Sequence, residues 1–477
     1  MVGANALLGK TLRDALPKLA RETGRDWVLA PSTEGYPAAD ANDPLKYHDD
    51  PAADARDGIL SRDGGHFEAL FSSGADAFAD EAGQLLRSKL PGLRFRISVE
   101  DVPRTRSQVH LSTELPVLAP CEWTGRGLAS TIIVQGEDRP AVSLDIARRH
   151  QAARHTEDGT AIDLASLLSA ETKLRLLNRP QELEDLVGNG YLALIHADGN
   201  GVGSGAGKSD SERAAFFHKN RVLLRRAVQK AINDHCPDQG QAPLIPLMLG
   251  GDDLLLVSRA EIALPFIVTL CKALDAFQQD SNGFKLTLGI GVVIAKHTIP
   301  VYRLHEVVEQ LASSAKRRVR GLKEAGEMSR SVVDWAVYST SSLDDPAEVR
   351  RREWLCGSDS DLRVLSQRPV DVLGQGLDSL QGLVNGAEKL KDAPRSQLRY
   401  LVDQLPRGRT LTELAFAELP NEVKRPLAEA GIREPWRRGA NNGPWLTALL
   451  DLVEITEIAR LGRNAELADS EGEVAYV

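Results

Sequence analysis

The pattern of apolar and polar positions is most regular in the middle of the chain. Apolar runs at 191–197 and 286–295 predict buried strands, and a third run at 244–257 is split into a hairpin by Gly-Gly-Asp-Asp. Gly and Asp supply the backbone conformations that a tight turn needs. Helical periodicity fills the intervals, and the first helix begins behind a capping box at 209–212. The resulting order, β-α-β-β-α-β, is that of a ferredoxin-like domain.

A weaker copy of this order lies between residues 3 and 100. The pattern predicts a helix at 3–22 and a strand at Trp27–Ala30. A Gly-rich turn at Asp63–Gly65 then leads into a strand at Phe67–Phe71, and a second helix at 75–89 precedes a last strand at Leu93–Val99. The first strand of the order is missing, and His66 and Phe67 stand where the other hairpin has Asp252 and Asp253. We therefore predict a degenerate copy without metal ligands. The alternative is two unrelated α+β segments that share an order.

The rest of the chain adds a connection and a helical end. A strand at Thr131–Gln135 and charged helices near 143–155 and 162–178 are expected in the connection. A helix at about 303–325 and an edge strand at Val332–Tyr338 extend the central domain. The predicted fold class is α+β, with two ferredoxin-like (βαββαβ) domains, the first degenerate, and a C-terminal helical domain. The predicted domain boundaries are 1–100, 101–190, 191–345 and 346–477.

Composition narrows the class of protein. The formal net charge of -9 means that the average field does not attract nucleic acid, so any such contact needs a local patch. The four cysteines include no C-x-x-C pair, which argues against a cysteine-ligated zinc site and against a disulfide framework. The sequence shows neither a signal peptide nor an apolar stretch of about 18 residues. We therefore expect a cytoplasmic protein that binds no zinc and no membrane.

Three aspartates are the candidate catalytic and metal-binding residues. Asp198 ends the first strand of the central domain, and Asp252 and Asp253 lie on the hairpin turn. In the predicted sheet the first strand lies beside this hairpin, so the three carboxylates converge at one edge. Clustered carboxylates are costly unless a cation neutralises them. Magnesium binds through a few carboxylates together with water and substrate phosphates, so two Mg²⁺ or Mn²⁺ ions are the expected cofactors.

Glycines near these aspartates predict close contact with a triphosphate. Gly199, Gly201, Gly203 and Gly250 leave room for phosphates to approach backbone amide groups. One alternative is that Gly-Gly-Asp-Asp is only a turn. A second is that the stretch from Gly201 to Ser209 is a P-loop, but that motif needs a glycine at Val202, so the register fails by one.

The motifs that surround the aspartates resemble a known family. HADGNGVG at 196–203 and LMLGGDDLLLV at 247–257 are similar to the second palm domain of the large subunit of type III CRISPR effector complexes. VGANALL at 2–8 and DGGHFEALF at 63–71 are similar to the inactive first palm of that family, and the helical C-terminus looks like its terminal helical domain. The resemblance implies metal-dependent conversion of ATP into cyclic oligoadenylates.

The resemblance carries over to single residues. It implies that Asp198, Asp252 and Asp253 bind the metals, and that Asp252 and Asp253 are the catalytic pair. Asn200 stands where an aspartate is common. It also implies nucleotide contacts for the motif residues Gly199, Asn200, Gly201, Gly250 and Gly251 and for the helical residue Lys316. The basic run that contains Lys316, Arg317, Arg318, Arg320 and Lys323 is a candidate phosphate or RNA surface, or an ordinary exposed helix face.

Two family features are absent from the sequence. His48-Asp49 has no further metal-ligand histidines spaced around it as an HD nuclease would, so we interpret it as a loop. The zinc-binding cysteine cluster is missing as well, and Cys121 stands alone. The predicted function is a nucleotidyltransferase or nucleotide cyclase that joins ATP units in antiviral defence. Its expected partners are nucleoside triphosphates, RNA and CRISPR-type effector subunits. The alternative is a catalytically silent scaffold that binds nucleotide or RNA.

Overall fold

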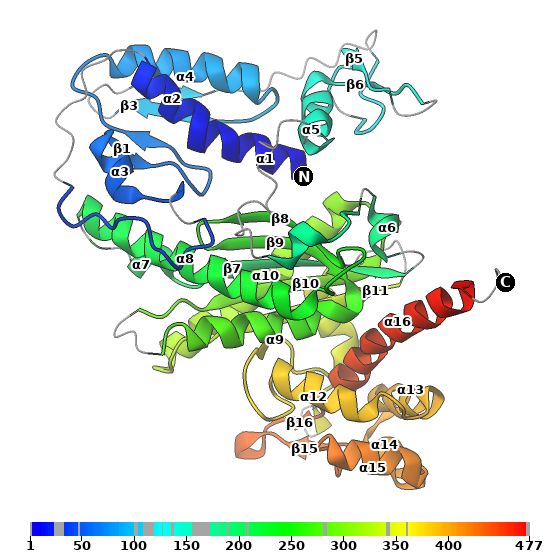
Figure 1. The fold of residues 1–477 in the computed structure, drawn as a ribbon. Helices are drawn as coiled ribbons and strands as arrows, with labels where there is room; N and C mark the ends of the chain where they lie inside the picture. The colour runs from blue at the N-terminus through cyan, green and yellow to red at the C-terminus, as the bar shows by residue number, and fades with distance from the viewer. Residues whose placement is uncertain are drawn as a thin grey trace. The chain divides into compact units, whose positions relative to one another are not determined.

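In the computed structural model, the chain folds into two compact units (Figure 1). One unit contains residues 1–170, 205–222 and 247–251, and the other contains 171–204, 223–246 and 252–477. The structure describes residues 2–22, 33–45, 48–99, 104–107, 119–125, 127–134, 138–154, 172–180, 182–187, 190–205, 207, 209–279, 284–339, 344–358 and 361–473. The four predicted domain boundaries remain predictions.

A six-stranded sheet, with the strand order β14-β11-β10-β7-β9-β8, is the centre of the fold. Strand β7 (Tyr191–Gly199) lies between β9 (Asp253–Arg259) and β10 (Leu288–Lys296) and is antiparallel to both. Strand β8 (Leu244–Gly250) is on the far side of β9. The strands predicted from the apolar runs are therefore confirmed, and so is their arrangement with the first strand beside the hairpin.

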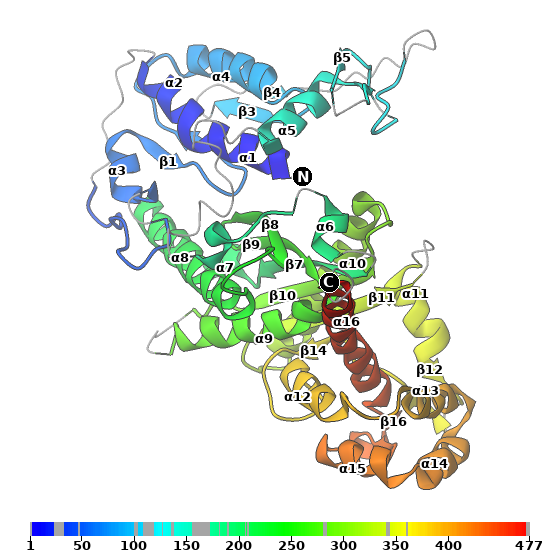
Figure 2. The same cartoon turned by 45° about the vertical axis from the view of Figure 1, so that its right-hand side comes forward.

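Helices and one further strand complete this region as predicted. Helix α8 (Asp210–His235) follows β7 after the short α7 (Val202–Gly205), and α9 (Ala260–Ala276) follows the hairpin. Helix α10 (Val301–Glu324) packs against β10 and β11, and Figure 2 shows α9 and α10 beside the sheet. Strand β11 (Val332–Tyr338) pairs in parallel with β10, and β14 (Val370–Asp371) pairs with β11. The predicted strand is thus present, but it is not at the edge of the sheet, because β14 pairs with its other side.

The capping box of α8 is confirmed in atomic detail. The Ser209 hydroxyl accepts a hydrogen bond from the Glu212 backbone amide at 3.2 Å, and the Glu212 carboxylate accepts one from the Ser209 amide at 3.0 Å. The two bonds satisfy donors that a helix start leaves unpaired. The sequence around Ser209 is therefore accounted for by a helix start. The neighbouring residue Lys208, which a P-loop would use, lies outside the described residues.

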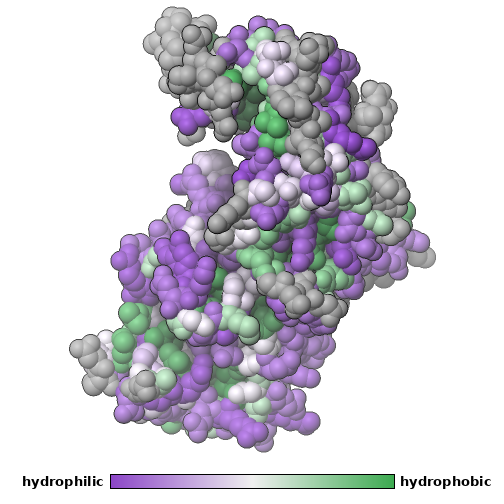
Figure 3. All heavy atoms as spheres, turned by 90° about the vertical axis from the view of Figure 1, so that its left-hand side faces the viewer, coloured by the Kyte–Doolittle hydropathy of each residue, from purple (hydrophilic) through white to green (hydrophobic). Residues whose placement is uncertain are grey.

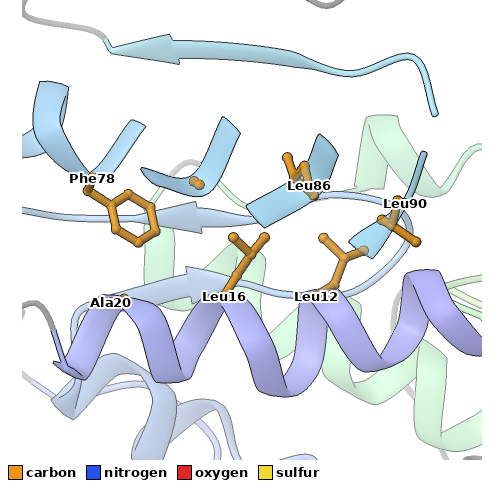
Figure 4. Close-up of a cluster of buried hydrophobic side chains, with 7 residues drawn as sticks. Leu12, Leu16, Ala20, Phe78, Leu86 and Leu90 are labelled. Atoms are coloured by element: carbon orange, nitrogen blue, oxygen red, sulfur yellow. The ribbon is translucent and has the colours of Figure 1, made fainter. Parts of the chain in front are cut away.

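The N-terminal segment packs helices on short strands. A helical stretch made of α1 (Val2–Lys10), η1 (Thr11–Ala15) and α2 (Leu16–Glu22) faces α4 (Ala75–Lys89) across a cluster of buried side chains. Figure 4 shows this cluster, whose labelled members are Leu12, Leu16, Ala20, Phe78, Leu86 and Leu90. Both predicted helices are confirmed.

The sheet of the N-terminal segment differs from that of the central domain. A hairpin of β1 (Ile59–Ser61) and β2 (Glu68–Ala69) turns at the predicted glycines, after the short α3 (Pro51–Arg56). Strand β3 (Arg96–Val99) pairs with β4 (Arg104–Ser107). In the described residues these are separate two-stranded sheets. The predicted strand at 27–30 lies outside those residues. The described elements follow part of the predicted order, and among the described residues they do not form one continuous sheet.

The described residues of the connection form a short hairpin and a few helices. Strand β5 (Thr131–Ile132) pairs with β6 (Ala141–Val142), and α5 (Leu144–Arg154) follows. Most of the predicted helix at 162–178 lies outside the described residues. Within its described end, η3 (Lys173–Leu176) forms one short 3₁₀ turn, and α6 (Leu183–Val187) precedes β7.

The C-terminal region is mainly helical, as predicted. Its helices are α11 (Pro346–Val349), η4 (Arg350–Trp354), α12 (Leu380–Leu390), α13 (Arg395–Gln404), η6 (Leu405–Arg407), α14 (Arg409–Glu418), α15 (Asn421–Glu429), η7 (Ala440–Asn442) and α16 (Leu449–Glu473). A small sheet that the sequence did not predict has the order β12-β13-β16-β15, formed by Leu355–Cys356, Arg363–Val364, Trp445–Leu446 and Arg437–Arg438.

One buried arginine connects this region to the central sheet. The Arg368 side chain is 0% exposed and donates hydrogen bonds to Asp451 at 2.9 Å, to Glu454 at 2.7 Å and to the Trp335 carbonyl at 3.0 Å. Asp451 and Glu454 lie on α16, and Trp335 lies on β11. A buried charge of this kind is tolerated because it is paired and hydrogen-bonded.

The surface shown in Figure 3 is mostly hydrophilic, and its hydrophobic side chains are surrounded by polar ones. Among the described residues, no helix combines the length and the apolar character that crossing a membrane requires.

Candidate active site

The three predicted aspartates come together at one end of the central sheet. Asp198 is the penultimate residue of β7, and Asp253 is the first residue of β9, directly after Asp252 in the turn. Because β7 and β9 pair antiparallel, with Ala197 opposite Leu254, the end of one strand meets the start of the other. One carboxylate oxygen from each aspartate lies within 4.8 Å of the other two. The convergence expected from the strand order is therefore found.

Burial and proximity make these carboxylates costly to charge. Burial raises the pKa of Asp252 above its ordinary value. Burial, and then the charge of Asp252, raise the pKa of Asp253 to about 6, against a smaller lowering by His196. Like charges that share a site oppose each other's ionisation, and a divalent cation removes this cost. Three carboxylates in this arrangement are an oxygen-donor set of the kind that Mg²⁺ or Mn²⁺ binds.

Lys316 lies at the same site. It is on α10, and its ammonium group forms an ion pair with the Asp198 carboxylate. Gly289 of β10 pairs with Asp198 in the sheet, and a Cβ atom at Gly289 would lie only 2.6 Å from Cγ of Lys316. The absence of a side chain at position 289 thus lets the lysine pass over the sheet to the aspartate. The structure places Lys316 beside Asp198, and its contact with nucleotide remains a prediction.

The neighbouring glycines and Asn200 have different surroundings. A Cβ atom at Gly199 would lie 2.5 Å from Oδ2 of Asp252, so only glycine fits there without moving the carboxylate. The Asn200 side-chain amide donates a hydrogen bond to the Thr287 hydroxyl at 3.1 Å, and its backbone amide donates to the Thr287 carbonyl at 2.8 Å. Asn200 therefore anchors the loop after β7 to the residue before β10. Gly250 is the last residue of β8, and Gly201 and Gly251 lie in the two turns. The nucleotide contacts of all three glycines remain predictions.

Two residues near the aspartates were not predicted from the sequence. His196 lies two positions before Asp198 on β7, so the alternation of a strand puts both side chains on one face. Its Nδ1 atom is 3.0 Å from the Glu309 carboxylate on α10, and burial lowers the pKa of His196. The signal for His196 was available as a polar residue within a buried strand. Glu309 could not be found in this way, because α10 reaches the site only through tertiary packing.

The basic run on α10 has two kinds of member. Lys316 is partly buried at the aspartates, whereas Arg317, Arg318, Arg320 and Lys323 are exposed. Arg318 is also 3.4 Å from Asp371 on β14. The prediction of a phosphate or RNA surface on this helix remains open for the exposed members.

Comparison with known proteins identifies the central domain. The family described as Cas10/Cmr2, second palm domain, matches residues 191–323. That interval runs from the start of β7 almost to the end of α10 and contains Asp198, Asp252, Asp253 and Lys316. No curated protein is similar in sequence to this chain.

Solved structures of Csm1 show a distant likeness. A Csm1–Csm4 cassette in complex with pppApApA is 16% identical with a TM-score of 0.31, and the match covers 58% of this chain and 38% of that one. A cassette in complex with cA4 is 16% identical with a TM-score of 0.32, over 58% and 38%. Csm1 in T. onnurineus is 14% identical with a TM-score of 0.30, over 58% and 40%. The chain thus spans well under half the length of these proteins.

The family match falls on the segment whose motifs carried the resemblance in the sequence. The sheet order and the convergence of the aspartates agree with a palm domain. The resemblance to the second palm of the type III CRISPR large subunit is therefore confirmed over residues 191–323.

Proposed function

We propose that the protein is a metal-dependent nucleotidyltransferase that joins ATP units into a cyclic or linear oligoadenylate. The observation that carries the proposal is the convergence of Asp198, Asp252 and Asp253 within 4.8 Å, with Lys316 in contact with Asp198. The family match to a Cas10/Cmr2 second palm supports this chemistry, and the sequence resemblance supplies the choice of ATP.

The residues have distinct roles in this proposal. The three aspartates hold divalent cations, which activate an attacking 3′-hydroxyl and stabilise the leaving pyrophosphate when they are bound. Asp252 and Asp253 are anionic, so they would act on the α-phosphate only through the cations that they would hold. The ammonium group of Lys316 lies beside Asp198. If a cation replaced Lys316 as the partner of Asp198, the ammonium group could pair with a phosphate oxygen. The turns at Gly199–Gly201 and Gly250–Gly251 present backbone amides to the triphosphate.

A silent scaffold is the second candidate, and two contacts favour it. Lys316 already neutralises Asp198, and the Asn200 amide is engaged by Thr287. A palm stabilised in this way has less need for two cations. In either case we propose a cytoplasmic protein whose partners are nucleoside triphosphates, RNA and CRISPR-type effector subunits.

The test is incubation of the purified protein with each nucleoside triphosphate and Mg²⁺ or Mn²⁺, with and without RNA, and product analysis by mass spectrometry. The matched control is Asp252→Asn/Asp253→Asn, which keeps side-chain size and removes both charges. A product made from ATP by the parent alone is the expected result. Metal-dependent nucleotide binding without any product, lost in the double variant, would instead establish the scaffold.

A further inference from the structure

A second cluster of potential metal ligands lies in the compact unit of residues 1–170, 205–222 and 247–251, here called the N-terminal unit. It contains Asp43, Asp49 and His218, and one ligand atom of each lies within 4.8 Å of the other two. All three side chains are buried, with exposed fractions of 1%, 5% and 5%. Asp43 and Asp49 belong to the segment before α3, and His218 is on the first half of α8. All three residues belong to the same compact unit.

The histidine of this cluster has an unsatisfied nitrogen. Within the described part of the chain, Nε2 of His218 is buried and has no hydrogen-bond partner. A buried polar atom without a partner costs roughly 1–3 kcal/mol, so such atoms are rare in folded proteins. A nearby cation that accepts the nitrogen lone pair removes this cost. The unsatisfied nitrogen is therefore an observation independent of the acidic residues, and it indicates a ligand.

Ion pairs and a backbone hydrogen bond surround the two aspartates of the cluster. Arg221, one turn after His218, donates to both oxygens of Asp49, at 2.8 and 3.1 Å, and lies 3.8 Å from Asp63. Asp63 in turn pairs with Arg13 at 2.6 Å. One oxygen of Asp43 accepts the Leu45 amide at 3.0 Å. Each carboxylate oxygen has two lone pairs, so an oxygen that accepts a hydrogen bond can also bind a metal.

We propose that Asp43, Asp49 and His218 bind a divalent transition-metal ion of the zinc or manganese class. One imidazole nitrogen with two carboxylate oxygens suits these ions better than Mg²⁺ or Ca²⁺, which take oxygen ligands alone. Ligands at about 2.0–2.2 Å from a tetrahedral ion lie about 3.4 Å apart, so the three atoms need only small side-chain movements to coordinate it. The sequence argument against zinc concerned cysteine ligands and does not apply to this set.

The proposed ion has a structural role. It ties the chain before α3 to helix α8 within the N-terminal unit, in addition to the ion pair of Asp49 with Arg221. A metal that binds only the folded state stabilises it by mass action. The dipeptide His48-Asp49, which the sequence alone marks as a loop, then contributes Asp49 to a site that no local motif reveals.

The test uses the full chain with Asp252→Asn/Asp253→Asn, so that the palm aspartates do not contribute binding. The chelated protein is titrated with Zn²⁺ and, separately, Mn²⁺, while calorimetry and the thermal unfolding midpoint are recorded. We expect one equivalent of at least one of the two ions to bind and to raise the midpoint. His218→Gln is expected to weaken binding at least tenfold and to abolish the rise. His66→Gln removes an exposed histidine of the same unit and should change neither.

A second variant protects the test against misfolding. Asp43→Asn keeps the oxygen that accepts the Leu45 amide but removes the charge, and it should also weaken binding. If both variants fail to fold, the visible absorption of Co²⁺ added to the parent tests whether the site exists. A four-coordinate site gives strong absorption bands, whereas hydrated Co²⁺ does not. Absence of bound ion in the parent overturns the proposal, and so does binding that folded His218→Gln and Asp43→Asn retain in full.

Discussion

The ammonium group of Lys316, on helix α10, pairs with the carboxylate of Asp198, at the end of strand β7. A residue far along the chain thus balances one of three clustered negative charges. The pair couples the position of α10 to the state of the aspartates. Binding of a cation or of a triphosphate at Asp198 must therefore compete with the lysine or engage it.

Replacement of Lys316 tests its role at the phosphates. We expect Lys316→Ala to reduce the rate of product formation about 10²-fold, as the loss of one stabilising group does in other active sites. Lys316→Arg should restore part of the rate, because it keeps the charge. Arg303→Ala, which removes an exposed cation of the same helix outside the basic run, is the control and should leave the rate unchanged. Equal rates for Lys316→Ala and the parent would exclude a catalytic contact.

Removal of the Asp253 charge should separate activity from stability. The pKa of Asp253 is raised to about 6, so at pH 7.5 its ionised form destabilises the metal-free fold. After allowance for solvent screening, we expect Asp253→Asn to stabilise the protein by about 1 kcal/mol while abolishing product formation. Denaturant unfolding without metal measures the first effect. A loss of stability in this variant would show that the carboxylate makes favourable contacts in the apo site.

Metal binding at the palm should depend on pH. The metal needs the ionised carboxylate, and a proton competes for Asp253 below a pKa of about 6. Affinity for Mn²⁺ is therefore expected to be nearly constant above pH 7 and to fall about tenfold for each unit below pH 6, for one competing proton. Titration of folded His218→Gln, which lacks the second proposed metal site, at pH 5, 6, 7 and 8 measures this. A flat profile would place the metal away from Asp253.

A methyl group at position 199 should disturb Asp252. The Cβ atom of Gly199→Ala would lie 2.5 Å from Oδ2 of Asp252, so the carboxylate must move. Displacement of a positioned group by about 1 Å lowers rates about 10²-fold. Gly321→Ala, where a Cβ also meets nothing within 4 Å, is the matched control because no phosphate contact is predicted for Gly321. Product formation is measured for both, and circular dichroism checks that both fold.

The parts of the fold that the sequence predicted are those that local patterns determine. The strands 191–197 and 286–295 are buried runs, and the Gly-Gly-Asp-Asp turn is set by its own residues, so β7, β10 and the β8–β9 hairpin were expected. The convergence of Asp198 with Asp253 followed from the strand order. The small sheet around Trp445–Leu446 has strands of two residues, too short to show periodicity.

Contacts between distant segments were beyond this reasoning. Glu309 meets His196 only because α10 packs on the sheet, and no spacing announces the pair. His218 is separated from Asp43 and Asp49 by most of the N-terminal half of the chain, so a search for local metal motifs passes over it. The neighbours of Asp49 in sequence predict only a loop, whereas in the fold Asp49 pairs with Arg221 on α8.

The buried Arg368 limits which parts of this protein evolution could exchange separately. Its partners Asp451 and Glu454 come from the last helix, and its third partner is a carbonyl on strand β11 of the palm. A recombination event that exchanged the C-terminal helices alone would leave Arg368 as an unpaired buried charge. The palm and its last helix are therefore expected to have been inherited together, as one piece.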